Sequence, residues 1–408
     1  MKEYRKLKNV IVVCDFGYIE GGASRVAHES AIELSKDFNV TLFCAVGPIS
    51  KELEESKVNV QCLGQSDILN NKNRISAFLQ GIWNGKAKKE FSGLLDKFSA
   101  IDTIIHVHTW TKGVSSSIFK IAENKKFEVL LTVHDYFLVC PNGGLYNYQK
   151  HMICEREPLS CKCICTNCDS RSYAHKIFRI CRQVVQNNFI RKRKNISYIF
   201  ISNFAKKQLL RRKPKIKKSY FLLNPINFEN RFRVNCAENE LYIYIGRLTD
   251  DKGIRIFCEG VTKAGVSAVV IGRGILEEEL KNKYPNIEFV GWLDKKDMSQ
   301  YIQKTRCLIF PSTYYEASPL TPLELMACGV PCIISDKNSS KELIMEEENG
   351  YLYNGYDADM LADKIKDSLD NKAIEKMSNK IYKTFDINKF SVEMHINSLI
   401  DIYNDVLK

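Results

Sequence analysis

Short runs of apolar residues alternate with helix-like segments along almost the whole chain. In the first half, the runs at residues 9–16, 39–46, 101–110 and 127–136 contain consecutive rather than alternating apolar residues. Strands of this kind are buried on both faces, which is typical of parallel sheets covered by helices. The pattern therefore predicts an α/β fold built on parallel strands.

The same alternation restarts in the second half, after a boundary near residues 222–227. Strand-like runs occupy residues 240–245, 267–274, 286–292, 306–312 and 330–335, with helix-like segments between them. Two alternating halves predict two doubly wound domains, and sheets of this type bind ligands at the carboxyl ends of their strands. We therefore expect a ligand in the cleft between the two domains.

Length and composition agree with two globular domains. The chain has 408 residues, of which 45% are hydrophobic and 26% are charged; this is long for one domain and ordinary for a globular protein. No uncharged apolar run approaches the ~18 residues that a membrane span needs. Residues 9–14 are too short for a signal-peptide core, and no small-residue cleavage site follows, so we expect the chain to stay in the cytosol.

The segment EASPLTPLE places two carboxylates, Glu316 and Glu324, around a predicted helix start. Thr321, Pro322 and Glu324 have the spacing of a capping box with proline at the first helical position, which alone would explain Glu324. Glu316 has no such explanation, because it follows a predicted strand, where a ligand would lie. Free amides near Leu320 and Thr321 offer an anion site. Carboxylates for sugar hydroxyls and amides for phosphate together suit a sugar nucleotide.

Two cations lie on the loop after the strand at residues 240–245. Arg247 and Lys252 are five residues apart, and an arginine fork beside a lysine point charge is suited to a diphosphate. Either residue alone would be an ordinary surface charge. Their occurrence together with Glu316 and Glu324 indicates a diphosphate site.

These segments resemble a known family. RLTDDKG (247–253), GRG (272–274), VGW (290–292) and EASPLTPLELMACGVPCIIS (316–335) are similar to the donor-domain signature of retaining GT-B glycosyltransferases of family 4, and the likeness covers nearly the whole chain. The resemblance implies a GT-B fold with two Rossmann-like domains facing across a cleft. It implies an acceptor domain at residues 1–221, a nucleotide-sugar donor domain at 222–388, and a C-terminal helix at 389–408 that crosses back to the first domain.

The resemblance also implies roles for individual residues. Arg247 and Lys252 would neutralise the departing diphosphate, Glu324 would bind the ribose, and Glu316 would bind a hydroxyl of the donor sugar. The other residues expected to bind the donor are Gly272, Arg273 and Trp292 near the base, Pro319, Leu320 and Thr321 beside the phosphate or sugar, and Gly21 and Gly22 in a glycine turn across the cleft. Because Pro319 has no N–H, Leu320 and Thr321 must donate. The glycine turn lacks the full dinucleotide spacing, so a simple tight turn remains an alternative.

Histidines follow two neighbouring strands of the first half. His106 and His108 share one face of the strand at residues 101–110, and His108 matches the histidine that the family places beside the reacting sugar. His134 and Asp135 end the next strand, so the resemblance places them on the acceptor side. A packed core histidine is the alternative for each position.

By the same resemblance, the reaction retains configuration and the donor phosphate takes the acceptor proton. The two cations replace a divalent ion, so no catalytic metal is required. Asp357-Ala-Asp359 has the spacing of a metal-binding DxD, but it lies where the family has a surface loop. Catalysis would then be electrostatic stabilisation of the leaving diphosphate.

Seven of the fifteen cysteines cluster between Cys140 and Cys181, and the other eight are scattered through apolar segments as expected for buried thiols in a reducing compartment. Cys165 and Cys168 have a zinc-knuckle spacing, and Cys154 with Cys161 or Cys163 could complete four ligands. A loop of reduced thiols is the alternative. Similar cysteine-containing insertions occur in capsule and surface-polysaccharide transferases of the resembled family, on the acceptor side.

A basic block covers residues 171–218, with sixteen Lys or Arg and no Asp or Glu, in a chain of net charge +12. Such a block favours an anionic partner, and each basic residue near an anionic leaflet contributes ~1 kcal/mol to membrane binding. A solvated basic face is the alternative. Nucleic acid is disfavoured, because the block carries no RNA- or DNA-binding motif.

These observations predict a cytoplasmic enzyme, peripheral on the inner face of the plasma membrane. It would transfer a sugar with retention from a UDP- or GDP-sugar to a lipid-linked or growing glycan acceptor during capsular, exopolysaccharide or O-antigen assembly. The alternatives are a nucleotide-sugar epimerase of the GT-B fold and a non-catalytic scaffold that binds sugar nucleotides.

Overall fold

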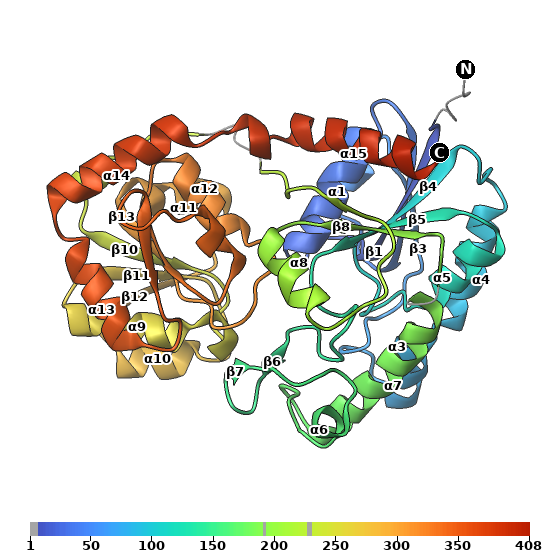
Figure 1. The fold of residues 1–408 in the computed structure, drawn as a ribbon, viewed down its shortest axis with the longest axis horizontal. Coiled ribbons are helices and arrows are strands. Elements are labelled where there is room, and N and C mark those ends of the chain that lie inside the picture. Colours follow the sequence, from blue (N-terminus) through green and yellow to red (C-terminus); the bar gives the residue numbers. More distant parts are fainter. Residues whose placement is uncertain (1–6, 191–192, 227–230) are drawn as a thin grey trace. The chain divides into compact units, whose positions relative to one another are not determined.

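The computed structural model describes residues 7–190, 193–226 and 231–408. They divide into two compact units, each built around its own sheet (Figure 1). The first unit consists of Met1–Gly144, Arg156–Pro225 and Val392–Lys408, and the second of Leu145–Glu155 and Ile226–Ser391. The prediction of an α/β fold with parallel sheets in two Rossmann-like domains is confirmed.

The sheet of the first unit contains the longest apolar runs of the chain. Its strands are β1 (Asn9–Phe16), β2 (Asn39–Val46), β3 (Asn59–Cys62), β4 (Thr103–Val107), β5 (Glu128–Val133), β8 (Ile196–Phe200) and β9 (Ser219–Phe221). They pair in parallel in the order β3-β2-β1-β4-β5-β8-β9. Val10, Ile11, Val12 and Val13 in β1 have no exposed surface, as expected for a strand covered on both faces.

The helices of the first unit include one from its C-terminal segment, Val392–Lys408. They are α1 (Gly22–Leu34), α2 (Lys51–Glu54), α3 (Arg74–Ile82), α4 (Gly85–Leu95), α5 (Ser117–Asn124), α6 (Cys161–Ile164), α7 (Tyr173–Ile190), α8 (Asn203–Leu210) and α15 (Val392–Val406). Helix α15 packs on α1 and β5 (Figure 1), and its Tyr403 hydroxyl lies 2.7 Å from His106 Nδ1 on β4. The C-terminal helix thus belongs to the first unit, as expected.

The sheet of the second unit is also parallel. Its strands are β10 (Leu241–Ile245), β11 (Ala268–Ile271), β12 (Glu288–Gly291), β13 (Thr305–Phe310), β14 (Cys332–Ser335) and β15 (Gly350–Tyr353), in the order β12-β11-β10-β13-β14-β15. The unit also contains an antiparallel hairpin of β6 (Tyr146–Asn147) and β7 (Met152–Ile153).

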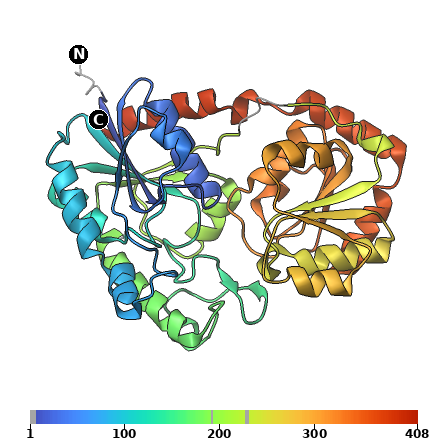
Figure 2. The ribbon, with the colours of Figure 1, turned by 180° about the vertical axis from the view of Figure 1, so that it is seen from behind.

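The helices of the second unit are α9 (Ile254–Ala264), α10 (Glu277–Lys283), α11 (Lys295–Gln303), α12 (Leu320–Ala327), α13 (Ala358–Asp367) and α14 (Asn371–Thr384), with short 3-10 helices η1 (Cys236–Glu238), η2 (Asp250–Lys252), η3 (Ser339–Leu343) and η4 (Asn388–Phe390). Figure 2 shows them from behind around their parallel strands. Helices α9 and α13 pack closely, because Gly260 of α9 leaves room for Leu361 of α13.

Both sheets reverse their strand order beside a central strand. In the first unit β1 lies between β2 and β4, and in the second unit β10 lies between β11 and β13. In parallel sheets, ligands bind in the crevice at such a reversal, outside the carboxyl ends of the strands. The fold therefore predicts ligand binding at the loops after β1 and β4 in the first unit, and at those after β10 and β13 in the second.

The units differ from the predicted domains in three segments: residues 222–225 belong to the first unit, and residues 145–155 and 389–391 belong to the second. Residues 145–155 lie within the predicted cysteine-rich insertion of the domain 1–221, yet they pack with the second unit. The reason is that Tyr146 is buried there, with its hydroxyl 3.1 Å from Thr313 Oγ1. Residues 227–230, near the predicted boundary, fall outside the described residues. Across the described segments, no helix combines the length and the apolar character needed to cross a bilayer.

Candidate functional site

Arg247 and Lys252 lie on the loop that follows β10. This loop is at the carboxyl edge of the sheet, beside the strand reversal where ligands bind in such folds. Tyr244 Oη donates to Arg247 O (2.7 Å), which fixes the start of the loop. Leu248 N donates to Arg273 O (3.0 Å), which joins this loop to the loop that follows β11. The loop ends in η2 and at Gly253, which has φ +71°. This left-handed conformation suits glycine.

The electrostatic surroundings of Arg247 are acidic. Burial acts to lower the pKa of this guanidinium, but the charges of Asp251 and Glu316 and the hydroxyls of Tyr314 and Tyr148 outweigh it, so the pKa is raised. Arg247 therefore stays charged, and although it is partly desolvated, part of its surface remains accessible to solvent. A charged, accessible arginine on this loop can bind an anion.

Glu316 lies on the loop that follows β13 and meets the β10 loop. Lys252 Nζ donates to Glu316 Oε1 (2.7 Å) and to Tyr314 Oη (3.2 Å), and Ser312 Oγ also donates to Glu316 Oε1. Glu316 is buried and Lys252 is half-buried, so water screens their ion pair only partly. The structure thus brings together two residues that are 64 positions apart in the sequence.

Helix α12 begins just after Glu316. Its N-cap is Pro319, not the predicted Thr321, and no side chain caps this helix start. The predicted capping box is therefore wrong, because Thr321 and Glu324 both lie inside the helix rather than at its cap. The amides of Leu320 and Thr321, by contrast, are in the first turn, where the helix provides no carbonyl partner. They remain available to an anion.

The residues predicted near the base follow the two remaining strands on this side of the sheet. Gly272, after β11, has φ +142°, and a Cβ there would lie 1.9 Å from Gly246 O. Gly272 N donates to Gly291 O (2.8 Å) at the end of β12. Arg273 is exposed, and Trp292 is 71% exposed. The structure thus places all three predicted residues at the carboxyl edge of the sheet.

In the first unit, the predicted glycines open α1. Gly21 is its N-cap, and Ser24 Oγ accepts from the amides of Glu20 and Gly21. Gly21 and Gly22 are exposed, and a Cβ on either would meet nothing within 4 Å. This turn presents open backbone at the carboxyl end of β1.

His108 and His134 form a pair at the ends of β4 and β5. His108 Nδ1 lies 2.9 Å from His134 Nε2, so one ring donates and the other accepts. Burial lowers the pKa of His134 to about 3, and burial with neighbouring imidazoles holds the pKa of His108 well below its ordinary value. Both rings are therefore neutral. His108 Nε2 is a buried polar atom without a hydrogen-bond partner in the described structure.

Asp135 directly follows His134, and Asp15 is a second buried aspartate of the first unit, which was not among the predicted site residues. Burial raises the pKa of Asp135 to about 6, against the lowering effect of the Phe137 amide and Arg182. Asp15, at the end of β1, accepts from the amides of Lys112 (3.0 Å), Gly113 (2.7 Å) and Val114 (2.9 Å). Asp15 thus shapes the loop after β4. The sequence indicates this role, because Asp15 is a carboxylate near the end of an otherwise apolar strand.

The zinc site expected at Cys154, Cys161, Cys163, Cys165 and Cys168 is not supported. No group of three or more His, Cys, Asp or Glu in the described segments is placed to hold a metal ion. Helix α6 turns Cys161 and Cys165 to solvent while Cys163 is buried, because residues two apart in a helix face different directions. A cation already occupies the buried side: fully buried Lys176 donates to Cys168 Sγ (3.1 Å) and Cys163 Sγ (3.5 Å).

The Asp357-Ala-Asp359 triplet has a structural role. Asp357 is the N-cap of α13, and its Oδ1 accepts from Met360 N (2.9 Å). Asp359 Oδ1 lies 2.8 Å from exposed Lys263. Both carboxylates are thus engaged in contacts with the protein itself.

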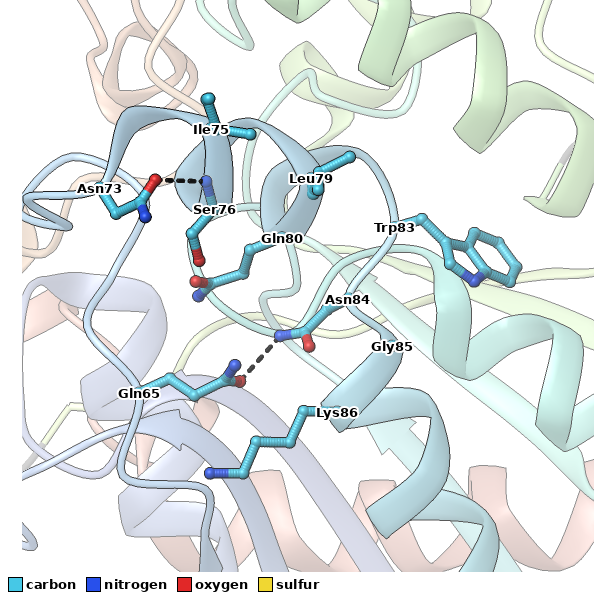
Figure 3. A pocket seen from close by; sticks show the side chains of 10 residues that line it. All are labelled: Gln65, Asn73, Ile75, Ser76, Leu79, Gln80, Trp83, Asn84, Gly85 and Lys86. Carbon is cyan, nitrogen blue, oxygen red and sulfur yellow. Dashed lines mark hydrogen bonds between the residues drawn. The ribbon is translucent and has the colours of Figure 1, made fainter.

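A surface pocket of about 430 Å³ lies elsewhere in the first unit, between α3 and the start of α4 (Figure 3). Asn84 Nδ2 donates to Gln65 Oε1 (2.8 Å) in its wall, and Ile75 and Leu79 of α3 stand at its rim. The residues that line it include none of the predicted site residues. The pocket is therefore a separate feature of this helix surface.

In the second unit, the arrangement has a definite chemical capacity. A buried Glu316 can accept from hydroxyls, Arg247 and Lys252 can meet negative charge, and the α12 amides can donate to a phosphate oxygen. These groups share one edge of one sheet. They suit an anionic ligand that also carries hydroxyls.

Comparison with known proteins supports the reading of this unit. Residues 227–384 match the family described as glycosyl transferases group 1, so the second unit carries a domain of that family. An uncharacterized 41.2 kDa protein in the cps region of Klebsiella pneumoniae is 24% identical over 325 residues, which are 75% of this chain and 80% of that protein. The UDP-Gal:alpha-D-GlcNAc-diphosphoundecaprenol alpha-1,3-galactosyltransferase of Escherichia coli is 26% identical over 146 residues, 34% of this chain and 37% of that protein.

A solved structure shows the same fold. Anabaena Alr3699/HepE, in complex with UDP, superposes with a TM-score of 0.68 over 98% of this chain and 100% of that chain, at 13% sequence identity. At this identity the likeness concerns the fold, which is GT-B. The predicted fold is confirmed, and the chain has glycosyltransferases among its relatives.

Proposed function

We propose that this chain is a retaining glycosyltransferase of family 4 that transfers a sugar from a nucleotide-sugar donor to a lipid-linked or growing glycan acceptor. The observation that carries this proposal is the Lys252–Glu316 pair, 2.7 Å apart, beside Arg247 in a glycosyl transferases group 1 domain. A surface polysaccharide is the proposed product. A relative in the cps region of Klebsiella pneumoniae and another whose name includes a diphosphoundecaprenol acceptor support it.

The donor is proposed to bind along the carboxyl edge of the second sheet. Arg247 and Lys252 meet its diphosphate, the amides of Leu320 and Thr321 face a phosphate or the sugar, and Glu316 accepts from a sugar hydroxyl. Glu324, half-buried in α12, accepts from the ribose. Fixed cations of this kind stabilise charge that builds on a leaving diphosphate. No divalent ion is needed in this scheme.

The first-unit residues are proposed to serve the sugar and the acceptor. His108 is neutral at physiological pH, because its pKa lies well below the ordinary value, so it can exchange hydrogen bonds with hydroxyls rather than act as a cation. Gly21 and Gly22 offer exposed backbone to the donor, and His134 and Asp135 lie on the acceptor side. The donor phosphate takes the acceptor proton.

A donor screen tests this function. The protein is mixed with UDP-, GDP-, ADP- and TDP-sugars in EDTA, and unfolding temperature and released nucleoside diphosphate are measured. One donor is expected to stabilise the fold, by about 2.7 kcal/mol at a hundredfold excess over Kd, and to release its diphosphate slowly despite EDTA. UDP-sugars are tested first, since the Anabaena structure holds UDP.

The alternatives give different results in that screen. An epimerase would change the sugar and release no nucleoside diphosphate, and a scaffold would bind without turnover. If no donor stabilises the protein or is hydrolysed, even with lipid acceptor in vesicles, the transferase proposal fails.

We further propose that the first unit docks on an anionic membrane. Helix α3 exposes Ile75, which is 75% exposed, together with Phe78 and Leu79. These positions share one helical face. Helix α7 exposes Tyr173, Ile177 and Val184, and the rings of Phe78 and Phe178 lie 5.4 Å apart where the two helices meet. The α3–α7 face is defined by these six exposed residues.

Positive charge around the α3–α7 face is complementary to an anionic surface. Lys72, Arg74, Lys86 and Lys89 are exposed next to α3. The basic block contributes through α7, although Lys176, Arg182 and Arg212 are buried and cannot face a membrane. Residues 191–192 of the block lie outside the described residues. An apolar strip flanked by cations is typical of an interfacial surface.

Vesicle binding checks this surface. The double substitution Ile75→Asp and Leu79→Asp is expected to weaken binding to phosphatidylglycerol vesicles at least tenfold, because apolar contact is lost and like charges repel. Ile101→Asp changes another exposed isoleucine, which lies before β4 and is 60% exposed, and should leave binding unchanged. Equal binding by wild type and the double variant would exclude this face as the docking surface.

A further inference from the structure

The hairpin Leu145–Glu155 is the segment whose place the sequence did not indicate. In it, Tyr146 of β6 pairs with Ile153 of β7, while the chain on both sides belongs to the first unit. Hairpins of two strands are barely stable alone. Yet Tyr146 is completely buried, and its ring packs on that of Tyr314 in the second unit, with the ring centroids 6.4 Å apart.

Thr313 is the residue that receives the hairpin. It is 2% exposed, its N–H donates to Asp251 O (3.0 Å), and its Oγ1 lies 3.2 Å from Asp250 O and 3.3 Å from Asp251 O. A hydroxyl has one proton, and carbonyl oxygens only accept. Thr313 Oγ1 therefore donates to these carbonyls, and the Tyr146 hydroxyl, 3.1 Å away, donates to Thr313.

The second strand of the hairpin reaches the same threonine through Tyr356. Its hydroxyl donates to Thr313 O (3.0 Å) and accepts from Ile153 N (2.9 Å). At the turn, His151 Nδ1 lies 3.6 Å from Asp250 Oδ2. Each backbone and side-chain polar atom of Thr313 is thus engaged, and both hairpin strands take part.

We propose that the hairpin is a positioning element of the donor site and that Thr313 is its point of action. Asp251 directly precedes Lys252, and Thr313 lies three residues before Glu316. By binding both Asp250 and Asp251 carbonyls, Thr313 joins the β10 loop to the β13 loop and sets the Lys252–Glu316 distance. The hairpin holds Thr313 in that orientation.

The catalytic part of this inference rests on the proposed glycosyltransferase function. A diphosphate is stabilised in the transition state only by groups already held at the right distance. If the β10 loop or the β13 loop becomes more mobile, kcat should therefore fall more than the affinity for the donor. The reason is that Glu324 and the residues near the base do not change. The structural part does not depend on activity.

Hydrogen exchange of the ligand-free protein tests the structural part. Tyr146→Phe removes one hydroxyl, and Thr313→Val removes the hydroxyl that joins the loops. Both are expected to speed amide exchange at residues 249–253 and 312–316 about fivefold or more, as losing one structural hydrogen bond implies. Tyr242→Phe is the matched control: Tyr242 is equally buried, its hydroxyl lies 2.7 Å from Ser368 Oγ, and it stands at the other end of β10. Unchanged exchange in the two loops would overturn the proposal.

Kinetics test the catalytic part. Tyr146→Phe and Thr313→Val should lower kcat about tenfold while the donor KM changes less than threefold, and Thr313→Ser should restore kcat. A kcat loss equal to that of Tyr242→Phe, or no rescue by serine, would refute positioning. If wild type transfers no sugar at all, the proposed function fails, and hydrogen exchange still decides whether the hairpin orders the two loops.

Discussion

Replacing Lys252 with alanine is expected to lower kcat by ~10²–10³, the loss typical of removing one group that stabilises transition-state charge. Lys252 Nζ lies 2.7 Å from Glu316 Oε1, so the substitution removes a cation and leaves a buried carboxylate with fewer donors. Its effect on kcat/KM should equal its effect on kcat, as for an interaction made in the transition state. Initial rates with the donor found in the screen measure both.

A surface lysine of the same unit provides the control. Lys281 forms an ion pair with Glu277 (2.8 Å) one helical turn away in α10, and pairs of this i,i+4 kind near a protein surface contribute little. Lys281→Ala should keep wild-type kcat. Turnover of Lys252→Ala within threefold of wild type would contradict the role assigned to this lysine, and with it the diphosphate site.

Replacing Gly253 with alanine is expected to disrupt the same loop through its backbone. Gly253 has φ +71°, and a Cβ there would lie 1.9 Å from Pro311 O. The left-handed conformation alone costs an alanine ~1–2 kcal/mol. The contact forces the β10 loop or the β13 loop to move as well. We expect the free energy of unfolding to fall by about 3 kcal/mol and the transferase rate to fall with it.

Gly265 separates the two causes. It caps α9 with φ +68°, but a Cβ there would meet nothing within 4 Å. Gly265→Ala should therefore lose only the ~1–2 kcal/mol of the left-handed conformation and keep full activity. Calorimetry of both variants compares them. Equal destabilisation would show that the Pro311 contact relaxes freely and that the loop position is not tightly set.

The sequence predicted those features that depend on local pattern. Unbroken apolar runs such as residues 9–16 and 39–46 indicated parallel strands, and β1 and β2 pair in parallel. Chain order after each strand then placed Arg247, Lys252 and Glu316 at one edge, because parallel strands present their carboxyl ends together. Nothing in the pattern gave the 2.7 Å distance between Lys252 and Glu316.

Features that depend on distant partners could not be predicted. The spacing of Cys161, Cys163 and Cys165 suggested metal ligands, but a short helix turns them in different directions and Lys176 occupies the buried side. The spacing of Thr321 and Glu324 suggested a capping box, but Pro319 is the N-cap. Tyr146 is packed by Thr313, which lies 167 residues further along the chain.

The position of α15 has a consequence for how the protein is made. Tyr403 on this last helix contacts His106 on β4, and His395 Nδ1 lies 2.8 Å from Leu223 O. On the ribosome, the first unit therefore cannot complete its packing until α15 emerges, long after its strands have been synthesised. During that interval the surface later covered by α15 is open to chaperones or to wrong contacts. The first unit therefore completes its packing only after the second unit has been synthesised.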